Sequence, residues 1–133
     1  MKITYGRGYV YSLQYHIVWC VKYRRKILTP DIETSLMAII QKIAKDNDFE
    51  ILEANMDKDH IHLLISCSPQ HYIPSIMKAL KGVSARLLMK AHGDFLKQNL
   101  LGSHLWNSSY FVATVSENTE AQIREYIERQ KEK

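Results

Sequence analysis

The chain has 133 residues, of which 46% are hydrophobic and 24% are charged, an ordinary composition for one globular domain spanning residues 1–133. No apolar run approaches the roughly 20 residues that a membrane helix needs, and the N-terminus has no apolar signal segment, so we expect a cytoplasmic protein without a membrane partner. The formal net charge of +4 and the pI near 9.0 favour an anionic partner such as a nucleic acid.

The first half of the chain predicts a strand, a helix and a hairpin. The segment "YVYSLQYHIVWCVKY" (residues 9–23) is rich in aromatic and β-branched residues and predicts the first strand. A helix is expected from Pro30, because apolar residues then recur at helical spacing, at Ile32, Leu36, Ile39, Ile40 and Ile43. The segments "FEILEANM" and "HIHLLISC" predict a second and a third strand, joined by a turn at residues 57–59.

The second half predicts another helix, a fourth strand and a final helix. The second helix is expected from about Ile73 to Ala91, residues 93–107 are less regular, and "SYFVATVS" predicts the fourth strand. Thr119 and Gln122 fit a capping box, which opens a last helix through about Gln130. This order predicts an α+β, ferredoxin-like (RRM-like) fold, in which two helices cover one face of a four-stranded antiparallel sheet. The other face stays available for a ligand, a partner or the last helix.

Two histidines one residue apart open the third predicted strand. Because side chains alternate along a strand, His60 and His62 share one face, while Ile61 and Leu63 share the face that packs against the helices. Two imidazoles on one face can converge on a divalent ion. A structural pair of histidines explains the same pattern, so H-x-H alone leaves both interpretations open.

A tyrosine and a glutamine lie one turn apart in the last predicted helix. Tyr126 and Gln130 are four residues apart and therefore project from one face, which Ile123 and Ile127 flank. A glutamine oxygen can complete a metal site, and a tyrosine hydroxyl beside a metal can act as a nucleophile. A plain amphipathic terminal helix has the same spacing, so the spacing does not decide between the two.

Taken together, these segments resemble a known family. "DKDHIHLLI" resembles the His-hydrophobic-His motif of the HUH superfamily of single-strand DNA nucleases. "YHIVWCVKYRRKIL", "LKGVSARLL", "LWNSSYFVATVSENT" and "IREYIERQ" resemble successive blocks of the single-tyrosine transposases of small bacterial and archaeal insertion sequences. The similarity extends from about Gly6 to Gln130, with the blocks in the family's order.

The resemblance implies a site and a reaction. His60 and His62 match the family's metal-binding histidines, Gln130 matches the third metal ligand, and Tyr126 matches the catalytic tyrosine. The family uses a magnesium-type ion, and Mn²⁺ should also serve because histidine is an unusual ligand for Mg²⁺. Tyr126 would attack a phosphodiester, giving a 5′-phosphotyrosine and a free 3′-OH, so rejoining needs no nucleotide cofactor. The expected partners are single-stranded DNA hairpins at the element ends and a second copy of the chain.

The link before the last helix departs from some relatives. In those relatives a glycine pair lets the tyrosine helix swing, and the helix of one subunit can complete the site of its partner. Here the link is Ser116-Glu117-Asn118. The sequence therefore leaves open whether Tyr126 acts on its own subunit or on the partner.

Basic and aromatic residues elsewhere are candidates for DNA contact. A cluster after the first strand and a patch on the second helix suit phosphates, whose binding would weaken with salt. Two residues before the fourth strand suit bases. The candidates are Lys22, Arg24, Arg25 and Lys26, then Lys78, Lys81, Arg86 and Lys90, and finally Trp106 and Asn107. Solvated turns and core packing are the alternative interpretations.

Two other functions stay open. One is a related HUH nuclease, such as a replication initiator or a domesticated transposase acting on chromosomal palindromes, although such proteins usually carry additional segments. The other is a non-catalytic single-strand binder, because RNA-recognition modules share this fold order. Such a module would place stacking aromatics on the two central strands, where this chain has His60 and His62.

Overall fold

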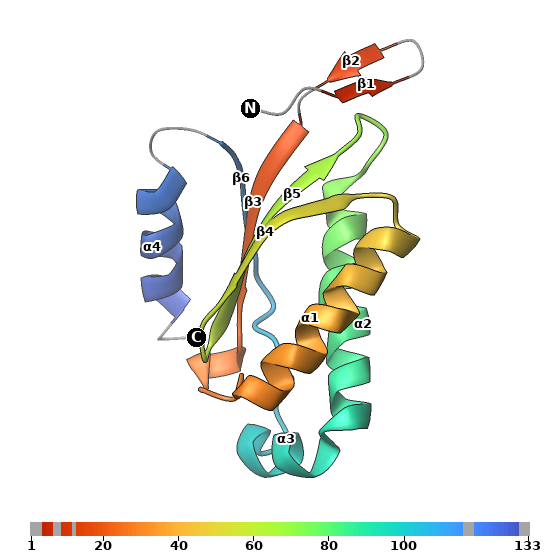
Figure 1. The fold of residues 1–133 in the computed structure, drawn as a ribbon. Helices are drawn as coiled ribbons and strands as arrows, with labels where there is room; N and C mark the ends of the chain where they lie inside the picture. Colours follow the sequence, from red (N-terminus) through yellow and green to blue (C-terminus); the bar gives the residue numbers. More distant parts are fainter. Residues whose placement is uncertain (1–3, 7–8, 12, 116–118, 131–133) are drawn as a thin grey trace.

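The computed structural model describes residues 4–6, 9–11, 13–115 and 119–130. A short hairpin of β1 (Thr4–Gly6) and β2 (Tyr9–Tyr11) precedes the main sheet. The main sheet consists of β3 (Leu13–Cys20), β4 (Glu50–Met56), β5 (His60–Cys67) and β6 (Phe111–Thr114). The helices are α1 (Pro30–Asp46), α2 (Ile73–Ala91), α3 (Gly93–Leu100) and α4 (Thr119–Arg129), with a 3₁₀ turn η1 (Lys22–Arg24) after β3 (Figure 1).

The main sheet is antiparallel throughout, in the order β4-β5-β3-β6. Helices α1 and α2 cover one face of this sheet, and α4 lies on the opposite face (Figure 1). This is the strand order of a ferredoxin-like fold, so the expected α+β architecture is confirmed. We call the face that carries α4 the open face.

The register of the central strands separates the core from the open face. Trp19 pairs with Ile61 and Ile17 with Leu63, and all four side chains are fully buried toward α1 and α2. A slip of one residue would turn this whole set outward, so burial of these side chains, about 2 kcal/mol each, enforces the register. Cys20 and Val18, which pair with His60 and His62, point to the open face.

Local signals explain where the long helices begin. Pro30 is the first residue of α1 and Pro74 lies in the first turn of α2, where a missing N–H breaks no intrahelical bond. Asp31 and Glu33 lie in the first turn of α1, near the positive end of the helix dipole. None of the helices within the described ranges is long and apolar enough to cross a membrane.

Two expectations about local structure were wrong. The segment 9–23 is not one strand, because residues 9–11 pair with β1 in a separate sheet, and β3 ends at Cys20, before the 3₁₀ turn η1. The segment 93–107 contains a regular helix, α3, whose Leu96 and Leu100 are buried one turn apart. Leu101 and Gly102 end α3 with positive φ values of 51° and 82°, a conformation that glycine adopts without strain. The link Ser116-Glu117-Asn118 lies outside the described residues.

Candidate functional site

Helix α4 packs on the open face of its own chain's sheet. It contacts β3 and β6, and its Ile123 is buried. Val18 and Cys20 point away from α1 and α2, yet both are fully buried. A second, smaller apolar layer therefore attaches α4 to the face that carries the two histidines.

His60 is oriented by a buried acidic neighbour. The Nδ1 atom of His60 lies 2.7 Å from Oδ1 of Asp59, whose side chain is only 7% exposed. Arg24 holds the other carboxylate oxygen of Asp59, since its Nε and Nη2 atoms both lie 3.0 Å from Oδ2. A carboxylate that accepts a hydrogen bond from Nδ1–H leaves the lone pair of Nε2 on His60 available for a metal ion.

His62 stands on the same face, closer to α4. Its Nε2 atom lies 2.8 Å from Nδ1 of His16, and the two rings are 5.0 Å apart. Burial, and next the neighbouring His16, lower the pKa of His62, which favours the neutral imidazole that metals bind. Together with side chains of α4, His62 lines a hollow of about 210 Å³, whose other residues are Glu120, Ile123, Arg124 and Ile127.

Tyr126 is half-buried between α4 and β6. Its hydroxyl lies 2.7 Å from Oγ of Ser109, and its ring lies 5.8 Å from that of Phe111. Burial raises the pKa of Tyr126, and the hydrogen bond between Tyr126 and Ser109 opposes that rise. The hydroxyl of Tyr126 contacts Ser109, and the N–H of nearby Asn107 donates to the carbonyl of Cys20 at 2.8 Å. Cys20 pairs with His60, so the tyrosine lies toward the His60 end of the sheet. A second hollow, of about 550 Å³, gives access to Tyr126 from between α4 and β6.

Gln130 is 3% exposed and lies beside Tyr126. Its Oε1 accepts a hydrogen bond from Oγ of Ser109 at 3.3 Å, and its Nε2 donates to the carbonyl of Tyr126 at 3.2 Å. Within the described ranges, no hydrogen bond joins Gln130 to His60 or His62. The structure thus brings Tyr126 and Gln130 together and sets both histidines on the face that α4 covers.

Arg24 connects the two halves of the site. Besides its ion pair with Asp59, its Nη1 atom donates to the carbonyl of Ile127 on α4 at 3.3 Å. The same side chain therefore contacts the residue that orients His60 and the helix that carries Tyr126. Sequence reasoning proposed Arg24 only as a DNA contact and missed Asp59, although Asp59 stands inside the quoted segment "DKDHIHLLI".

Asp57, Asp59 and His60 form a group of potential metal ligands, with ligand atoms within 4.8 Å of one another. Asp57 is exposed, and its Oδ1 accepts the N–H of Lys58. Asp59 is already neutralised by Arg24 and bonded to His60. These contacts therefore favour a role for Asp59 in orienting His60 over a role as a direct ligand of an ion.

Asp59→Asn is expected to destabilise the fold by about 1–3 kcal/mol, because it leaves the largely buried Arg24 without its counter-charge. It should also weaken divalent metal binding about 10- to 100-fold, since His60 loses its orienting carboxylate. Urea unfolding and Mn²⁺ titration measure the two effects. Asp57→Asn is the matched control on the same turn, and a loss of Mn²⁺ affinity in that control would instead make Asp57 a ligand.

The structure gives several proposed DNA contacts an internal partner. Trp106 and Asn107 are 6% and 2% exposed, and Nε1 of Trp106 donates to Oγ of Ser84 at 3.0 Å. Nζ of Lys81 donates to the carbonyls of Asn107 and Ser109 at 2.6 and 3.0 Å. Arg25 donates to the carbonyl of Leu100 and to the hydroxyl of Ser103. These side chains offer little free surface to DNA, and their role in binding stays a prediction.

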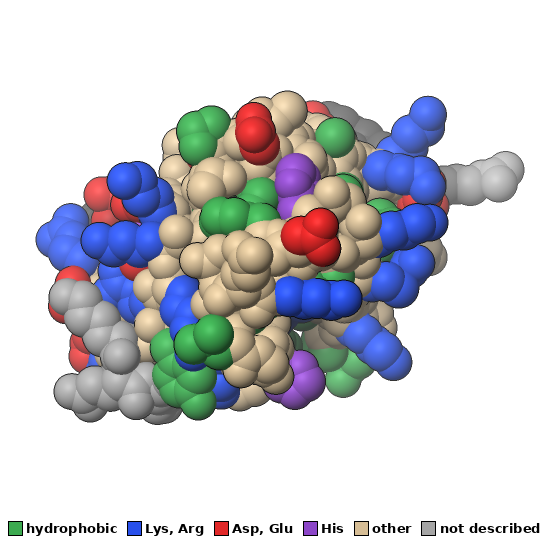
Figure 2. Space-filling view, turned by 90° about the horizontal axis from the view of Figure 1, so that it is seen from below, with side chains coloured by type: hydrophobic (Ala, Val, Ile, Leu, Met, Phe, Trp, Pro, Cys, Tyr) green, Lys and Arg blue, Asp and Glu red, His purple; other side chains and the backbone are tan. Residues whose placement is uncertain are grey.

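Other basic candidates remain available at the surface. Lys26, Lys78, Arg86 and Lys90 are exposed, and Lys22 is half-buried. Seen from the end that carries η1 and α3, Lys and Arg side chains gather on two opposite sides of the molecule, toward α4 and toward α1 and α2 (Figure 2). This distribution suits a polyanion, and each candidate still awaits a test.

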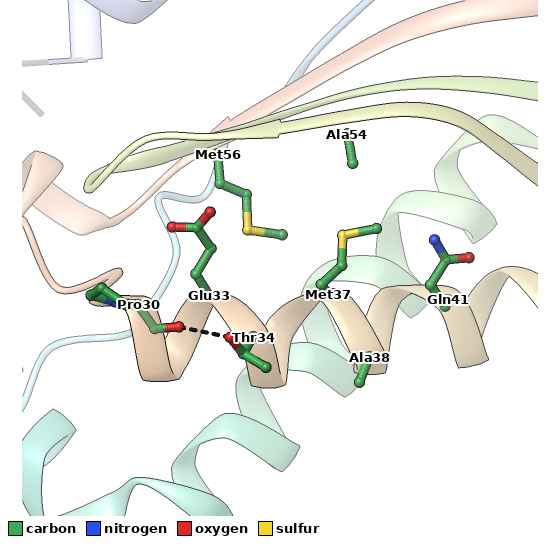
Figure 3. Close-up of a pocket in the computed structure, with 8 residues that line it drawn as sticks. All are labelled: Pro30, Glu33, Thr34, Met37, Ala38, Gln41, Ala54 and Met56. Carbon is green, nitrogen blue, oxygen red and sulfur yellow. Dashed lines mark hydrogen bonds between the residues drawn. The ribbon is translucent and has the colours of Figure 1, made fainter.

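A further groove lies on the other side of the sheet. Met37 of α1 and Met56 of β4 point toward each other across it, and its other lining residues are Pro30, Glu33, Thr34, Ala38, Gln41 and Ala54 (Figure 3). Ala54 and Met56 pair with Leu63 and Ile61, which point to the helix-covered face. The groove is therefore separated by the sheet from the histidines and the tyrosine.

Comparisons with known proteins relate the chain to DNA transposases. The family model described as "Transposase IS200 like" matches residues 9–130. The ISDra2 transposase TnpA of Deinococcus radiodurans is 48% identical over 133 residues, which cover 100% of this chain and 94% of that protein. The transposase of insertion sequence element IS200 from Salmonella typhimurium is 36% identical over 122 residues, or 92% of this chain and 79% of that protein.

Solved structures agree with this relationship. A crystal structure of a transposase candidate from Deinococcus radiodurans has a TM-score of 0.90 at 47% identity, covering 96% of this chain and 97% of that chain. A REP-associated tyrosine transposase bound to a REP hairpin has a TM-score of 0.59 at 16% identity, covering 91% of this chain and 67% of that chain. The second structure shares the fold.

Proposed function

Because this chain belongs to the IS200-like transposase family, we propose that it cuts and rejoins single-stranded DNA at the ends of an insertion sequence through a covalent 5′-phosphotyrosine. One observation carries the proposal. The open face of a single sheet holds His60 and His62, and the helix that covers this face holds Tyr126 and Gln130.

The donor set on the open face suits a divalent ion. His60 keeps Nε2 available because its Nδ1–H donates a hydrogen bond to Asp59, and burial lowers the pKa of His62, which favours its neutral form. We propose His60, His62 and Gln130 as the ligands, with Mg²⁺ or Mn²⁺ as the ion. When bound, the ion would offset the negative charge that develops on the phosphate. For His62 to bind through Nε2, that atom must leave its hydrogen bond with His16.

Tyr126 is the proposed nucleophile. Its oxygen attacks the phosphorus, a P–O bond to the tyrosine forms, and the bond to the 3′ oxygen breaks, so that one DNA end leaves with a free 3′-OH. The covalent bond conserves the energy of the phosphodiester, and a second 3′-OH can therefore reverse the reaction and join a new strand. The hollow between α4 and β6 provides a path by which a strand reaches Tyr126.

The proposed DNA partner is a hairpin in single-stranded DNA. The REP-associated relative was solved with a REP hairpin, which supports a hairpin as partner for this chain as well. The exposed cations Lys26, Lys78, Arg86 and Lys90, with Lys22, are the proposed phosphate contacts, and raised salt should weaken binding through them. We also propose that the working form is a homodimer, which light scattering with and without DNA measures.

The test uses 3′-labelled single-stranded oligonucleotides tiled across the DNA that flanks the gene. We expect a covalent protein–DNA adduct with the oligonucleotide that contains a cleavage site, in Mg²⁺ or Mn²⁺ and not in EDTA. The duplex form of the same sequence should give no adduct, because its strands are already paired. Tight hairpin binding without cutting in either metal would instead support a non-catalytic single-strand binder.

A further inference from the structure

Ser109 is the common hydrogen-bond partner of Tyr126 and Gln130. Its Oγ lies 2.7 Å from the Tyr126 hydroxyl and 3.3 Å from Oε1 of Gln130. These two residues lie one helical turn apart on α4, whereas Ser109 precedes β6. One hydroxyl group on the sheet side thus contacts both proposed functional groups of the helix.

The turn that carries Ser109 is held by several buried groups. Oδ1 of Asn107 accepts the backbone N–H of Ser109 at 3.1 Å, and the Asn107 N–H donates to the carbonyl of Cys20 at 2.8 Å. Lys81 reaches from α2 and donates to the carbonyls of both Asn107 and Ser109. Lys81 is half-buried, and this burial lowers its pKa.

The orientation of the Asn107 amide follows from these contacts. Since the Ser109 N–H needs an acceptor, Oδ1 of Asn107 must face it. Nδ2 of Asn107 is then buried with no hydrogen-bond partner among the residues that the structure describes. A buried donor without a partner is unfavourable for stability. The turn therefore keeps Ser109 in place while one donor stays unsatisfied, and a role at a functional site is one of the reasons such a group is retained.

We propose that Ser109 is a positioning residue for strand cleavage, which fixes the direction of the Tyr126 hydroxyl and the Gln130 carbonyl relative to the histidine face. This rests on the function proposed above. The Ser109 hydroxyl accepts from the phenol before attack, while its own proton can turn to Oδ1 of Asn107 or Oε1 of Gln130. During rejoining the same proton can turn to the departing tyrosine oxygen. Ser109 itself forms no covalent bond.

The test compares Ser109→Ala with Ser108→Ala, because Ser108 is the exposed neighbour on the same turn. At saturating single-stranded oligonucleotide, Ser109→Ala should slow single-turnover adduct formation about 10- to 100-fold, the effect expected when a nucleophile loses its orientation. The oligonucleotide concentration that gives half the maximal rate should change less than about twofold. Ser109→Thr, which keeps a hydroxyl, should restore most of the rate.

A second measurement needs neither DNA nor metal. With 3-fluorotyrosine incorporated, the ¹⁹F signal that disappears in Tyr126→Phe belongs to Tyr126. That signal should shift in Ser109→Ala and stay in place in Ser108→Ala. If Ser109→Ala does not fold, as judged by its thermal unfolding, then Ser109→Cys, which is close in shape and a poor hydrogen-bond partner, takes its place.

The outcomes separate this proposal from the proposed function. If the wild-type protein forms no adduct with any flanking oligonucleotide, the proposed function fails, and the ¹⁹F signal still decides whether Ser109 holds Tyr126. If the wild-type protein and Ser108→Ala form the adduct and Ser109→Ala does so equally fast, the positioning role is overturned. An unmoved ¹⁹F signal in Ser109→Ala overturns the contact itself.

Discussion

Tyr126→Phe is expected to abolish the covalent protein–DNA adduct, with a loss of about 10⁴-fold or more in cleavage, because phenylalanine lacks the hydroxyl that attacks the phosphorus. Phenylalanine keeps the ring that packs 5.8 Å from Phe111. The variant loses only the hydrogen bond to Ser109, which contributes about 1 kcal/mol, so the fold and hairpin binding should survive. Denaturing gels of a 3′-labelled oligonucleotide measure the adduct.

The control for this variant is Tyr72→Phe. Tyr72 is 68% exposed at the start of α2, on the helix-covered side of the sheet, and its hydroxyl has no role in the proposed reaction. Tyr72→Phe should form the adduct at the wild-type rate. An undiminished adduct in Tyr126→Phe would assign the nucleophile to another residue, which peptide mapping of the adduct would then identify.

His60→Ala and His62→Ala are each expected to weaken Mn²⁺ binding by more than about 100-fold and to remove metal-dependent cleavage, since each deletes a proposed ligand. The ion pair of Asp59 with Arg24 remains in His60→Ala, so that variant should fold. Electron paramagnetic resonance measures the free Mn²⁺, the bound ion follows by difference, and the same samples are assayed for cutting.

His104→Ala provides the comparison, because His104 is exposed in the loop after α3. It should bind Mn²⁺ and cut DNA as the wild-type protein does. If His62→Ala retained wild-type Mn²⁺ affinity, His62 would not be a metal ligand, and its role would be the hydrogen bond with His16. Cutting by His60→Ala at the wild-type rate in Mg²⁺ would contradict a metal role for His60.

Most of the fold could be predicted from local patterns. Period-two alternation in residues 60–65 assigned the core and open faces of β5 correctly, because adjacent side chains in any strand point to opposite faces. The end of the first strand at Cys20 was missed, since no glycine or proline separates β3 from the 3₁₀ turn η1 that follows it. Helix α3 was missed because only two of its residues, Leu96 and Leu100, supply a buried face.

The candidate site was predictable to the extent that its residues are neighbours in the sequence. His60 with His62, and Tyr126 with Gln130, are placed together by the geometry of a single strand and a single helix. Sequence reasoning missed Asp59, Ser109 and His16. Each of these acts on another residue of the site through a side-chain hydrogen bond, and the residue types alone give no sign of such contacts.

The sequence by itself determined which side chains share a face, because strand alternation and helical periodicity are properties of a few consecutive residues. Only the tertiary structure decided which faces meet. Arg24 reaches Ile127 across 103 residues of sequence, and Ser109 reaches Tyr126 across 17. Such contacts depend on how α4 packs against the sheet. That packing follows from the joint burial of Val18 and Cys20 with Ile123, which lies far from them in the sequence, so no local pattern predicts it.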